Sequence, residues 1–359
     1  MGKGHRFSYN WTLKDANFTK DKGKVFSCFA CGGGSTMGYK LAGFDVIGCN
    51  EIDPKMNECY VRNNNPKYNY VCDIRDMVKS NELPEELYNL DILDGSPPCS
   101  TFSISGSRED SWGVEKKFRE GQKKQVLDTL FFDFIDLAKK LKPKIVVSEN
   151  VKGLLMGNAK NYVKKIYHEF DLAGYYCQHF LLNAYNMGVP QNRERLFFLC
   201  IRKDIGNKFL HKKNLFDLVP FIDMNFKEEP ILFKEIVDYG GKEIKKGSKT
   251  RFLWDNQKIE DKSLCDVYQR LYNKRGFYNF NFFDERSVAP TLTPAEHMTL
   301  ILKTKPMYLS RNEIIKISSF PLDYKGNDKE IGYLCGMSVP PVMMANVANN
   351  IYEQWLSKL

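Results

Sequence analysis

Short apolar runs alternate with helix-like segments through the first 150 residues, and this alternation constrains the fold more than any other feature. The strand-like runs are Val25–Phe29, Val46–Asn50, Tyr68–Cys72, Leu90–Asp94 and Lys144–Ser148. Helix-like segments lie between them, at Ser35–Ala42, from Pro54 onward and at Gln122–Leu141. Strands that alternate with helices form a parallel sheet with helices on both faces. The sequence therefore predicts an α/β fold with a doubly wound, mostly parallel sheet.

The regular alternation stops after Arg202 and returns only at Arg286. The stretch between them is rich in Lys, Asp, Glu, Phe and Tyr, and a helix-like segment from Val342 to Trp355 closes the chain. A chain of 359 residues is long enough for one large domain with a smaller inserted domain. We expect four segments, which are a loose polar arm at 1–22, a main domain at 23–202, an inserted region at 203–285 and a returning segment at 286–359.

The overall composition is that of a globular protein, with 27% charged and 43% hydrophobic residues and a net charge of +9. This basic excess permits a polyanionic partner. The chain contains no apolar run of the roughly 20 residues that a membrane helix needs, and its first residues lack the apolar core of a secretion signal. Ten scattered cysteines fit a reducing compartment. We expect a cytoplasmic protein that does not contact membranes.

Cysteine and histidine spacing gives no metal site. Cys28 and Cys31 form the one CxxC pair, and no second pair completes a zinc site. The five histidines show no ligand spacing either. We therefore expect no metal, and we interpret both thiols of the CxxC pair as structural.

A stiff turn presents one cysteine directly after the fourth strand-like run, in the sequence Ser96-Pro97-Pro98-Cys99. Two prolines cannot continue a strand or enter a helix interior, so they form a rigid mount. Strand ends in open α/β sheets are where catalytic groups collect, and an exposed thiolate is a strong nucleophile. Cys99 is therefore a candidate nucleophile, and the alternative is a buried cysteine beside a loop.

A glycine-rich turn, Phe29-Ala30-Cys31-Gly32-Gly33-Gly34, follows the first strand-like run and lets a cofactor approach the backbone closely. It is not the dinucleotide fingerprint GxGxxG, because Met37 takes the place of the last glycine, which argues against a nicotinamide oxidoreductase. It is not a phosphate-binding P-loop either. The alternative interpretation is an ordinary tight turn between a strand and a helix.

Two carboxylates stand at the ends of the next two strands. Glu51 stands at the end of the second strand and could accept hydrogen bonds from ribose hydroxyls. Asp73 stands at the end of the third strand and could reach an adenine amino group. Each alone is more often a helix cap or a solvated charge. Together with the glycine-rich turn they indicate a cofactor that contains adenosine.

Taken in order, these motifs resemble those of the DNA cytosine-5 methyltransferases of bacterial and phage type. The matching segments are Phe29–Gly34, Glu51, Asp73-Ile74, Gly95–Cys99 with Phe102-Ser103, Glu149-Asn150-Val151, Gln191-Asn192-Arg193-Glu194-Arg195, Arg286–Thr291 and Gly336–Pro341. The match covers the chain except for 1–22 and 203–285. The resemblance implies a Rossmann-like methyltransferase fold with a smaller inserted target-recognition domain, here 203–285.

The resemblance also implies catalytic roles. The family's nucleophile, here Cys99, attacks C6 of a cytosine that is flipped out of the duplex, and this attack activates C5 for methylation. The family's Glu-Asn-Val glutamate, here Glu149, hydrogen-bonds the base at N3 and N4. Arg193 and Arg195 match the family's Gln-x-Arg-x-Arg motif, with one expected at the base or at Glu149 and the other at structural contacts. The alternative for both arginines is a charged strand edge.

The implied cofactor is S-adenosyl-L-methionine. Its ribose would contact Glu51, and its adenine would contact Asp73 and Ile52. The residues that the resemblance places around the whole cofactor are Phe29, Ala30, Gly32, Gly33, Gly34, Glu51, Ile52, Asp73, Ile74, Pro97, Ser338 and Val339.

The implied partner is double-stranded DNA, bound by a monomer, with the loop from Ser100 to Gln122 closing over the flipped base. The sequence does not reveal the bases around the target or a companion restriction enzyme. Two alternatives stay open, which are a transfer-RNA cytosine-5 methyltransferase of the same fold and a non-catalytic DNA-binding relative. The first is disfavoured because the Cys-Phe-Thr segment of those relatives is absent, and the second because Cys99, Glu149 and Arg195 are intact.

The chain departs from the family pattern in four places. Phe-x-Gly-x-Gly is replaced by Phe29-Ala30-Cys31-Gly32-Gly33, Ser100 follows the cysteine in place of the frequent glutamine, Leu127-Asp128 stands where many members have Arg-Gly, and Met337 replaces the common asparagine before Ser338. The changes at Cys31 and Met337 concern contacts to the cofactor. None of the four removes the nucleophile or Glu149, so we expect activity.

Overall fold

The computed structural model describes residues 4–98, 129–156, 159–212, 218–278, 280–294 and 300–359. Within them the chain forms two compact units, which we treat separately. The sheet unit comprises Asn17–Asn183, Glu194–Phe226 and Met344–Leu359. The second unit comprises Met1–Ala16, Ala184–Arg193 and Lys227–Met343.

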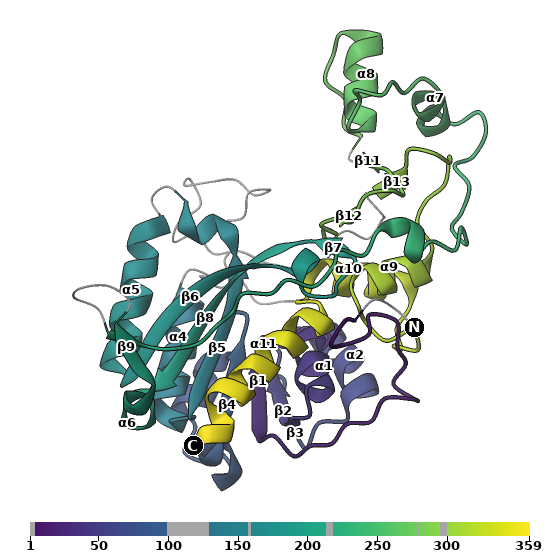
Figure 1. Cartoon of the computed structure of the whole chain (residues 1–359). Coiled ribbons are helices and arrows are strands. Elements are labelled where there is room, and N and C mark those ends of the chain that lie inside the picture. Colours follow the sequence, from purple (N-terminus) through teal and green to yellow (C-terminus); the bar gives the residue numbers. More distant parts are fainter. Residues whose placement is uncertain (1–3, 99–128, 157–158, 213–217, 279, 295–299) are drawn as a thin grey trace. The chain divides into compact units, whose positions relative to one another are not determined.

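The sheet unit is built around a seven-stranded sheet with the order β3-β2-β1-β4-β5-β8-β6 (Figure 1). Its strands are β1 (Lys24–Cys28), β2 (Asp45–Asn50), β3 (Tyr68–Tyr70), β4 (Ile92–Gly95), β5 (Ile145–Val151), β6 (Tyr175–Asn183) and β8 (Glu194–Arg202). The first five pair in parallel, whereas β8 pairs antiparallel with both β5 and β6. This confirms the mostly parallel α/β fold.

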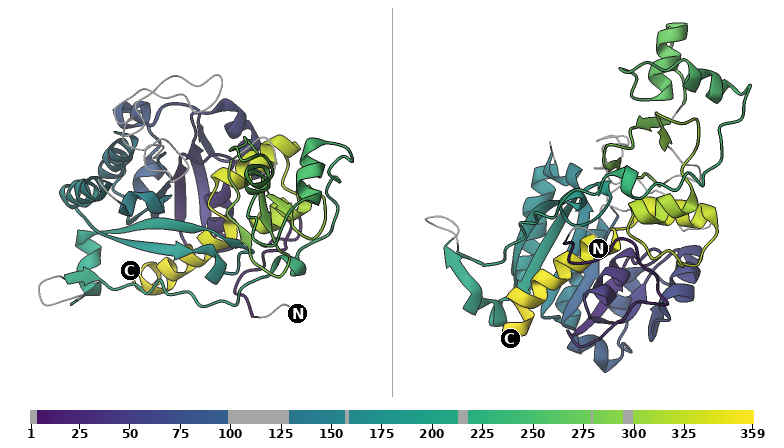
Figure 2. Two further views of the ribbon diagram at one scale, coloured as in Figure 1. Left: turned by 90° about the horizontal axis from the view of Figure 1, so that it is seen from above. Right: turned by 45° about the vertical axis from the view of Figure 1, so that its right-hand side comes forward.

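Helices cover both faces of this sheet. They are α1 (Gly34–Leu41), α2 (Pro54–Asn64), α3 (Ile74–Lys79), α4 (Leu130–Leu141), α5 (Ala159–Leu172), α6 (Lys203–Gly206) and α11 (Pro341–Gln354). Apolar side chains of α3, α4 and α5, among them Phe131 and Phe134 of α4, form one core cluster with the strands. On the other face α11 runs along the strands (Figure 2). There the ring of Phe44 packs edge-on against the rings of Tyr39 and Tyr352.

Local sequence explains where these helices begin. Asp53 caps α2 by accepting from the backbone of Lys55, and Pro54 stands at the first helical position, where its missing N–H costs nothing. Apolar residues of α4 recur at helical spacing and are buried. The predicted helix Gln122–Leu141 is confirmed from Leu130 onward, and 122–128 lie outside the described residues.

The sheet unit ends in a small hairpin of β9 (Leu210–Lys212) and β10 (Leu218–Pro220). Residues 203–226 therefore belong to the same compact unit as the sheet, whereas the predicted inserted region begins at 203.

The second unit is a smaller assembly of short helices and strand pairs. Its helices are α7 (Lys249–Asp255), α8 (Leu264–Tyr272), α9 (Arg311–Ile317) and α10 (Asp328–Met337), and its strands are β7 (Gln191–Asn192), β11 (Asn281–Phe283), β12 (Ala289–Pro290) and β13 (Leu300–Leu302). A local core of Ile244, Leu253, Leu264, Val267 and Ile301 joins α7 and α8 to β13. Residues 286–343 lie in this unit and not with the sheet.

The part of the N-terminal arm up to Ala16 belongs to the second unit and is bound to it, so it is not loose. Trp11 donates its indole N–H to the carbonyl of Ser319 at 3.0 Å, and its own carbonyl accepts from Leu322 at 2.9 Å. The Asp323 carboxylate accepts from the backbone of Leu13 at 2.6 Å. The arm's polar composition concealed these contacts because most of them use backbone groups.

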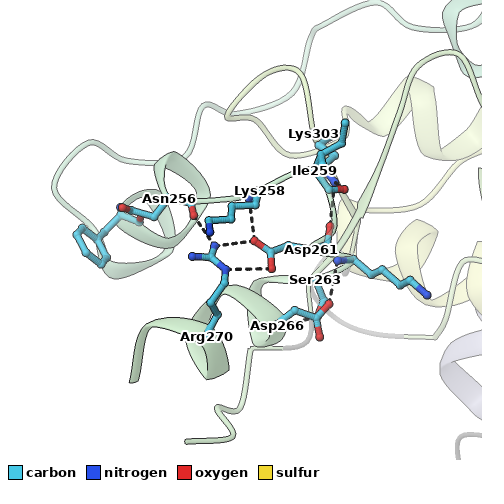
Figure 3. A network of polar contacts seen from close by, with 10 residues as sticks. Asn256, Lys258, Ile259, Asp261, Ser263, Asp266, Arg270 and Lys303 are labelled. Carbon is cyan, nitrogen blue, oxygen red and sulfur yellow. Dashed lines mark hydrogen bonds and ion pairs between the residues drawn. The ribbon is translucent and has the colours of Figure 1, made fainter. Parts of the chain in front are cut away.

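A network of charged side chains fixes the connection between α7 and α8 (Figure 3). The Asp261 carboxylate accepts from the Arg270 guanidinium and from the backbone of Lys258, both at 2.7 Å. Lys303 donates to the carbonyls of Ile259 and Asp261 at 2.6 and 2.9 Å. The connection is therefore held from two sides.

No single helix in the described part of the chain is long and apolar enough to cross a membrane. The helices Asp328–Met337 and Pro341–Lys358, which are bent against each other, have a sufficient length and composition only when they are counted together.

Candidate active site

The glycine-rich turn and the proline turn meet at the point where the strand order of the sheet reverses. β1 and β4 are neighbours in parallel register, with Cys28 opposite Gly95. From β1 the chain proceeds outward to β2 and β3, and it then returns to β4. Such a switch point leaves a crevice at the carboxyl ends of the strands, where ligands of doubly wound sheets bind. Phe29–Gly34 and Ser96–Pro98 follow these two strand ends directly.

The backbone of the glycine-rich turn is strongly curled. Phe29, Cys31 and Gly33 have φ of 52°, 47° and 95°, all in the left-handed region that favours glycine. The amide of Gly33 donates to the carbonyl of Ala30 at 2.9 Å and closes the turn before α1. Cys31 therefore adopts a left-handed conformation at the position where the family pattern has glycine. The backbone follows the same course as with glycine, at some cost in strain because cysteine has a Cβ.

Glu51 lies against this turn at the end of β2. Its carboxylate accepts from the backbone amides of Cys31 at 2.7 Å and Asp53 at 2.8 Å. Burial raises the pKa of Glu51 to about 7, although hydrogen bonds from backbone amides oppose the shift. A carboxylate has about four acceptor positions, so Glu51 keeps acceptor capacity for a further donor such as a hydroxyl group.

Asp73 stands at the start of α3, two strands from the turn. Its carboxylate caps the helix by accepting from the backbone of Arg75 at 3.0 Å and contacts the Arg75 guanidinium at 3.3 Å. The helix-cap alternative therefore holds for Asp73. Its side chain keeps 27% of its surface exposed, so the contact to adenine stays a prediction. Ile74 is buried and Ile52 is partly buried.

Three contacts fix the base of the proline turn. A Cβ on Gly95 would lie 2.5 Å from a ring carbon of Phe134, so α4 packs directly on the strand end and only glycine fits there. The Asn150 amide donates to the carbonyl of Pro97 at 3.1 Å. The Asp94 carboxylate accepts from Ser27 and Tyr39 on the neighbouring elements. Cys99 and the loop 100–122 lie outside the described residues.

Glu149 and Arg195 form an ion pair beside this turn. The Arg195 Nε donates to Glu149 Oε1 at 2.9 Å, and the two side chains are 15% and 10% exposed. They come from the antiparallel strands β5 and β8, in which Val151 faces Arg195 and Glu149 faces Phe197, so the pair is diagonal. Burial lowers the pKa of Arg195, and the charge of Glu149 opposes this shift. A buried carboxylate oriented by a guanidinium can bind a flat ligand that carries N–H donors.

Arg193 lies in the second unit and is fully buried. Its guanidinium donates to the carbonyls of Gly336 at 2.8 Å and Leu292 at 3.0 Å, and to the Gln191 side chain at 3.3 Å. These contacts join β7, the segment after β12 and the end of α10. They favour a role in holding the backbone, while a catalytic role for Arg193 stays a prediction.

Ser338 and Val339 also lie in the second unit, at the end of α10. Both are buried, and the Ser338 Oγ has no hydrogen-bond partner among the described residues. A buried hydroxyl of this kind has its hydrogen-bonding capacity open to a ligand. Their contact to the methionine end of a cofactor stays a prediction.

The described part of the chain contains no group of three or more His, Cys, Asp and Glu side chains that could hold a metal ion.

The family model of C-5 cytosine-specific DNA methylases matches residues 23–353. The chain belongs to this family. Among curated proteins, the type II methyltransferase M.FnuDI of Fusobacterium nucleatum is 29% identical over 93% of this chain and 96% of its own length. The type II methyltransferase M.Bsp6I of a Bacillus strain is 26% identical over 93% and 99%. Both cover the second unit as well as the sheet.

Solved structures show the same fold. One is described as a DNA modification methyltransferase encoded within a prophage of E. coli, and it matches 92% of this chain and 99% of its own with a TM-score of 0.63 and 19% identity. A mutant of the DNMT2 protein from Spodoptera frugiperda matches the same shares with a TM-score of 0.61 and 17% identity.

The C-5 cytosine-specific DNA methylases use S-adenosylmethionine in general, and the residues of this chain fit it. The curled turn follows the end of β1 and lies against Glu51, which has acceptor capacity left for hydroxyl groups. Sequence reasoning predicted site roles for the turn, Glu51, Glu149 and Arg195, and these roles stay predictions. It missed Asp94 and the contact of Asn150 with Pro97, since their partners lie more than fifty residues away along the chain.

Proposed function

We propose that this chain transfers the methyl group of S-adenosyl-L-methionine to C5 of a cytosine in a specific sequence of duplex DNA, through covalent attack by Cys99. The observation that carries the proposal is the Glu149–Arg195 ion pair beside the turn that leads to Cys99, on the same sheet as the curled glycine turn. A base-holding carboxylate, a nucleophile mount and a cofactor turn then share one crevice.

In this proposal Glu51 accepts hydrogen bonds from the ribose, while Asp73, Ile52 and Ile74 contact the adenine. In the sheet unit, the rest of the proposed cofactor site is lined by Pro97 and the backbone of Phe29–Gly34. The family pattern assigns Ser338 and Val339 to the cofactor as well. The bound cofactor supplies an electrophilic methyl group on a sulfonium. The turn and the carboxylates of this chain orient that group toward the base.

Cytosine C5 is a weak nucleophile, and the proposed chemistry activates it. The Cys99 thiolate forms a bond to C6, and the electron pair of the C5–C6 double bond becomes available at C5. Glu149 is assigned to the N3 and N4 edge of the base, where its carboxyl group gives a proton to N3 and accepts from the N4 amino group. The proton neutralises the negative charge that the attack places on the ring, and Arg195 orients the side chain. C5 takes the methyl group, and loss of the C5 proton expels the thiolate and restores the ring. The base must leave the duplex for this to happen.

We assign sequence recognition to the second unit, which includes most of the predicted region 203–285. Residues 271–275, which include Lys274 and Arg275, are exposed, and so is the ring of Phe277 two positions further along the chain. Cations bind phosphates, and exposed aromatic side chains contact bases. The curated relatives that cover this unit are type II methyltransferases, which supports double-stranded DNA as the partner.

Bisulfite sequencing of plasmid DNA from cells that express the chain tests the proposal. We expect protected cytosines in one recurring sequence, and none with Cys99→Ala. With purified protein and labelled S-adenosyl-L-methionine, duplex DNA should become labelled, and duplex containing 5-fluorocytosine should trap a covalent adduct because fluorine blocks the final elimination. Label that enters only transfer RNA would contradict the proposal in favour of the RNA enzyme. Unchanged turnover by Cys99→Ala would refute the nucleophile.

A further inference from the structure

A buried carboxylate joins the two halves of the proposed site, and neither the family pattern nor the reaction assigns it a task. Asp94 is the third residue of β4 and is 1% exposed. Ser27 of β1 donates to its Oδ2 at 2.8 Å, and Tyr39 of α1 donates to its Oδ1 at 3.2 Å. These partners lie 67 and 55 residues away along the chain.

The position of the two partners matters because they flank the glycine turn. Ser27 stands on β1 just before Phe29, and Tyr39 stands on α1, the helix that begins at Gly34. Asp94 itself stands just before Gly95, Ser96 and Pro97, whose carbonyl is held by Asn150. One carboxylate therefore holds both ends of the cofactor turn and the base of the proline turn.

No cation compensates the charge of Asp94, since no ion pair to it exists among the described residues. The titratable groups that face it are Cys28 of β1, Tyr39 of α1 and Glu149 of β5, whose charge is held by Arg195. Burial raises the pKa of the Cys28 thiol and the Tyr39 hydroxyl well above their ordinary values, so both stay protonated near neutral pH. Burial likewise raises the pKa of Asp94 to about 7, against the two hydroxyl hydrogen bonds.

The two protonation states of Asp94 hold the site differently. A carboxylate accepts from both hydroxyls with charge-assisted bonds, which are roughly twice as strong as neutral ones. In a protonated carboxyl group one oxygen becomes a donor. The Ser27 and Tyr39 hydroxyls then no longer each face a charged oxygen that accepts. The observed contacts, with one hydroxyl on each oxygen, match the charged form.

We propose that Asp94 is a positioning residue of this enzyme, whose charged carboxylate clamps the cofactor turn to the proline turn so that methyl transfer is faster when Asp94 is ionised. The inference rests on the proposed function, because it concerns the rate of the same reaction. Asp94 touches neither the base nor the methyl group in this proposal. It acts through Ser27, Tyr39 and the strand end that they share.

The test is the pH dependence of single-turnover methyl transfer to duplex DNA, with labelled S-adenosyl-L-methionine at saturation, between pH 6 and 9. The wild-type rate should rise with pH through a midpoint near the Asp94 value of about 7. Asp94→Asn should lose this rise and be slower by about tenfold at pH 8, since an amide keeps only one acceptor oxygen. Ser27→Ala should move the midpoint upward, because the Ser27 hydroxyl lowers the pKa of Asp94.

Ser148→Ala is the matched control, since Ser148 is a buried serine on the neighbouring β5 whose Oγ has no hydrogen-bond partner among the described residues. Its pH profile should equal that of the wild type. The same midpoint of the pH–rate curve in the wild type, Asp94→Asn, Ser27→Ala and Ser148→Ala would overturn the proposal, even if Asp94→Asn melts at a lower temperature. A purely structural role of Asp94 would change the stability without moving this midpoint. A wild-type protein that transfers no methyl group to DNA would instead contradict the proposed function.

Discussion

At the scale of single residues, the two arginines of the Gln191–Arg195 motif have different surroundings although they stand two positions apart. Arg195 pairs with the Glu149 carboxylate in the sheet unit, and Arg193 donates to the carbonyls of Leu292 and Gly336 in the second unit. Alternation along a strand sends side chains at i and i+2 to one face, but β7 ends at Asn192 and β8 begins at Glu194, so this rule does not apply across the break.

Lysine substitution separates the two roles. Arg195→Lys keeps a charge but loses the flat guanidinium that orients Glu149, so we expect a single-turnover rate lower by about 10- to 100-fold with melting changed by only a few degrees. Arg193→Lys should instead lower the melting temperature, with a cost of about 2–3 kcal/mol from buried carbonyls left unpaired. Rapid-quench kinetics and thermal melts measure both. A slow but fully stable Arg193→Lys protein would indicate that Arg193 acts on the base.

At the scale of elements, local pattern predicted the parallel strands closely, since β1, β2, β4 and β5 each begin or end within about three residues of the predicted runs. The antiparallel strands β6 and β8 have no such signal. Residues Leu196–Ile201 of β8 are all buried, so the strand lacks the alternation that marks a half-exposed strand. Asp94 could not be recognised as a site residue because no local pattern links it to Ser27 and Tyr39.

The turn after α8 is the element from which we expect DNA contacts. α8 ends at Tyr272, Asn273 caps it in the left-handed conformation with φ of 49°, and Lys274 and Arg275 follow in exposed positions. Arg270, two residues before the end of α8, ties the helix to the connection from α7 through the Asp261 carboxylate (Figure 3). Exposed cations next to such a helix end can bind phosphates.

Replacing both cations, Lys274→Ala with Arg275→Ala, should weaken DNA binding and reduce the slope of log affinity against log salt by roughly 2, because each phosphate contact contributes about 0.9. Fluorescence anisotropy with duplex DNA at several salt concentrations measures the slope. Lys55→Ala, an exposed lysine at the start of α2, serves as the control and should leave the slope unchanged. An unchanged slope in the double variant would exclude this turn from the DNA interface.

At the scale of the whole molecule, two buried carboxyls make folding stability depend on pH. Burial raises the pKa of Glu51 and of Asp94 to about 7, from ordinary values of 4.5 and 3.8. The folded chain therefore holds protons at these sites that the unfolded chain has already released between about pH 4 and 7. Proton binding at these two carboxyls therefore stabilises the folded state. This stabilisation is fully present below the ordinary pKa values and is lost as the pH rises through 7.

Thermal melts of the cofactor-free protein should consequently show falling stability from pH 5 to pH 8, with a flatter curve for Glu51→Gln and for Asp94→Asn. Added S-adenosyl-L-methionine should reverse part of this trend, because ribose hydroxyls donate better to a charged Glu51 and so bind more tightly as the pH rises. The gain in melting temperature on adding the cofactor should therefore grow with pH in the wild type and stay constant in Glu51→Gln. A gain that is equal at pH 5 and pH 8 in the wild type would remove Glu51 from the cofactor site, while a stability curve that stays level in the cofactor-free protein would show that neither carboxyl is protonated near neutral pH.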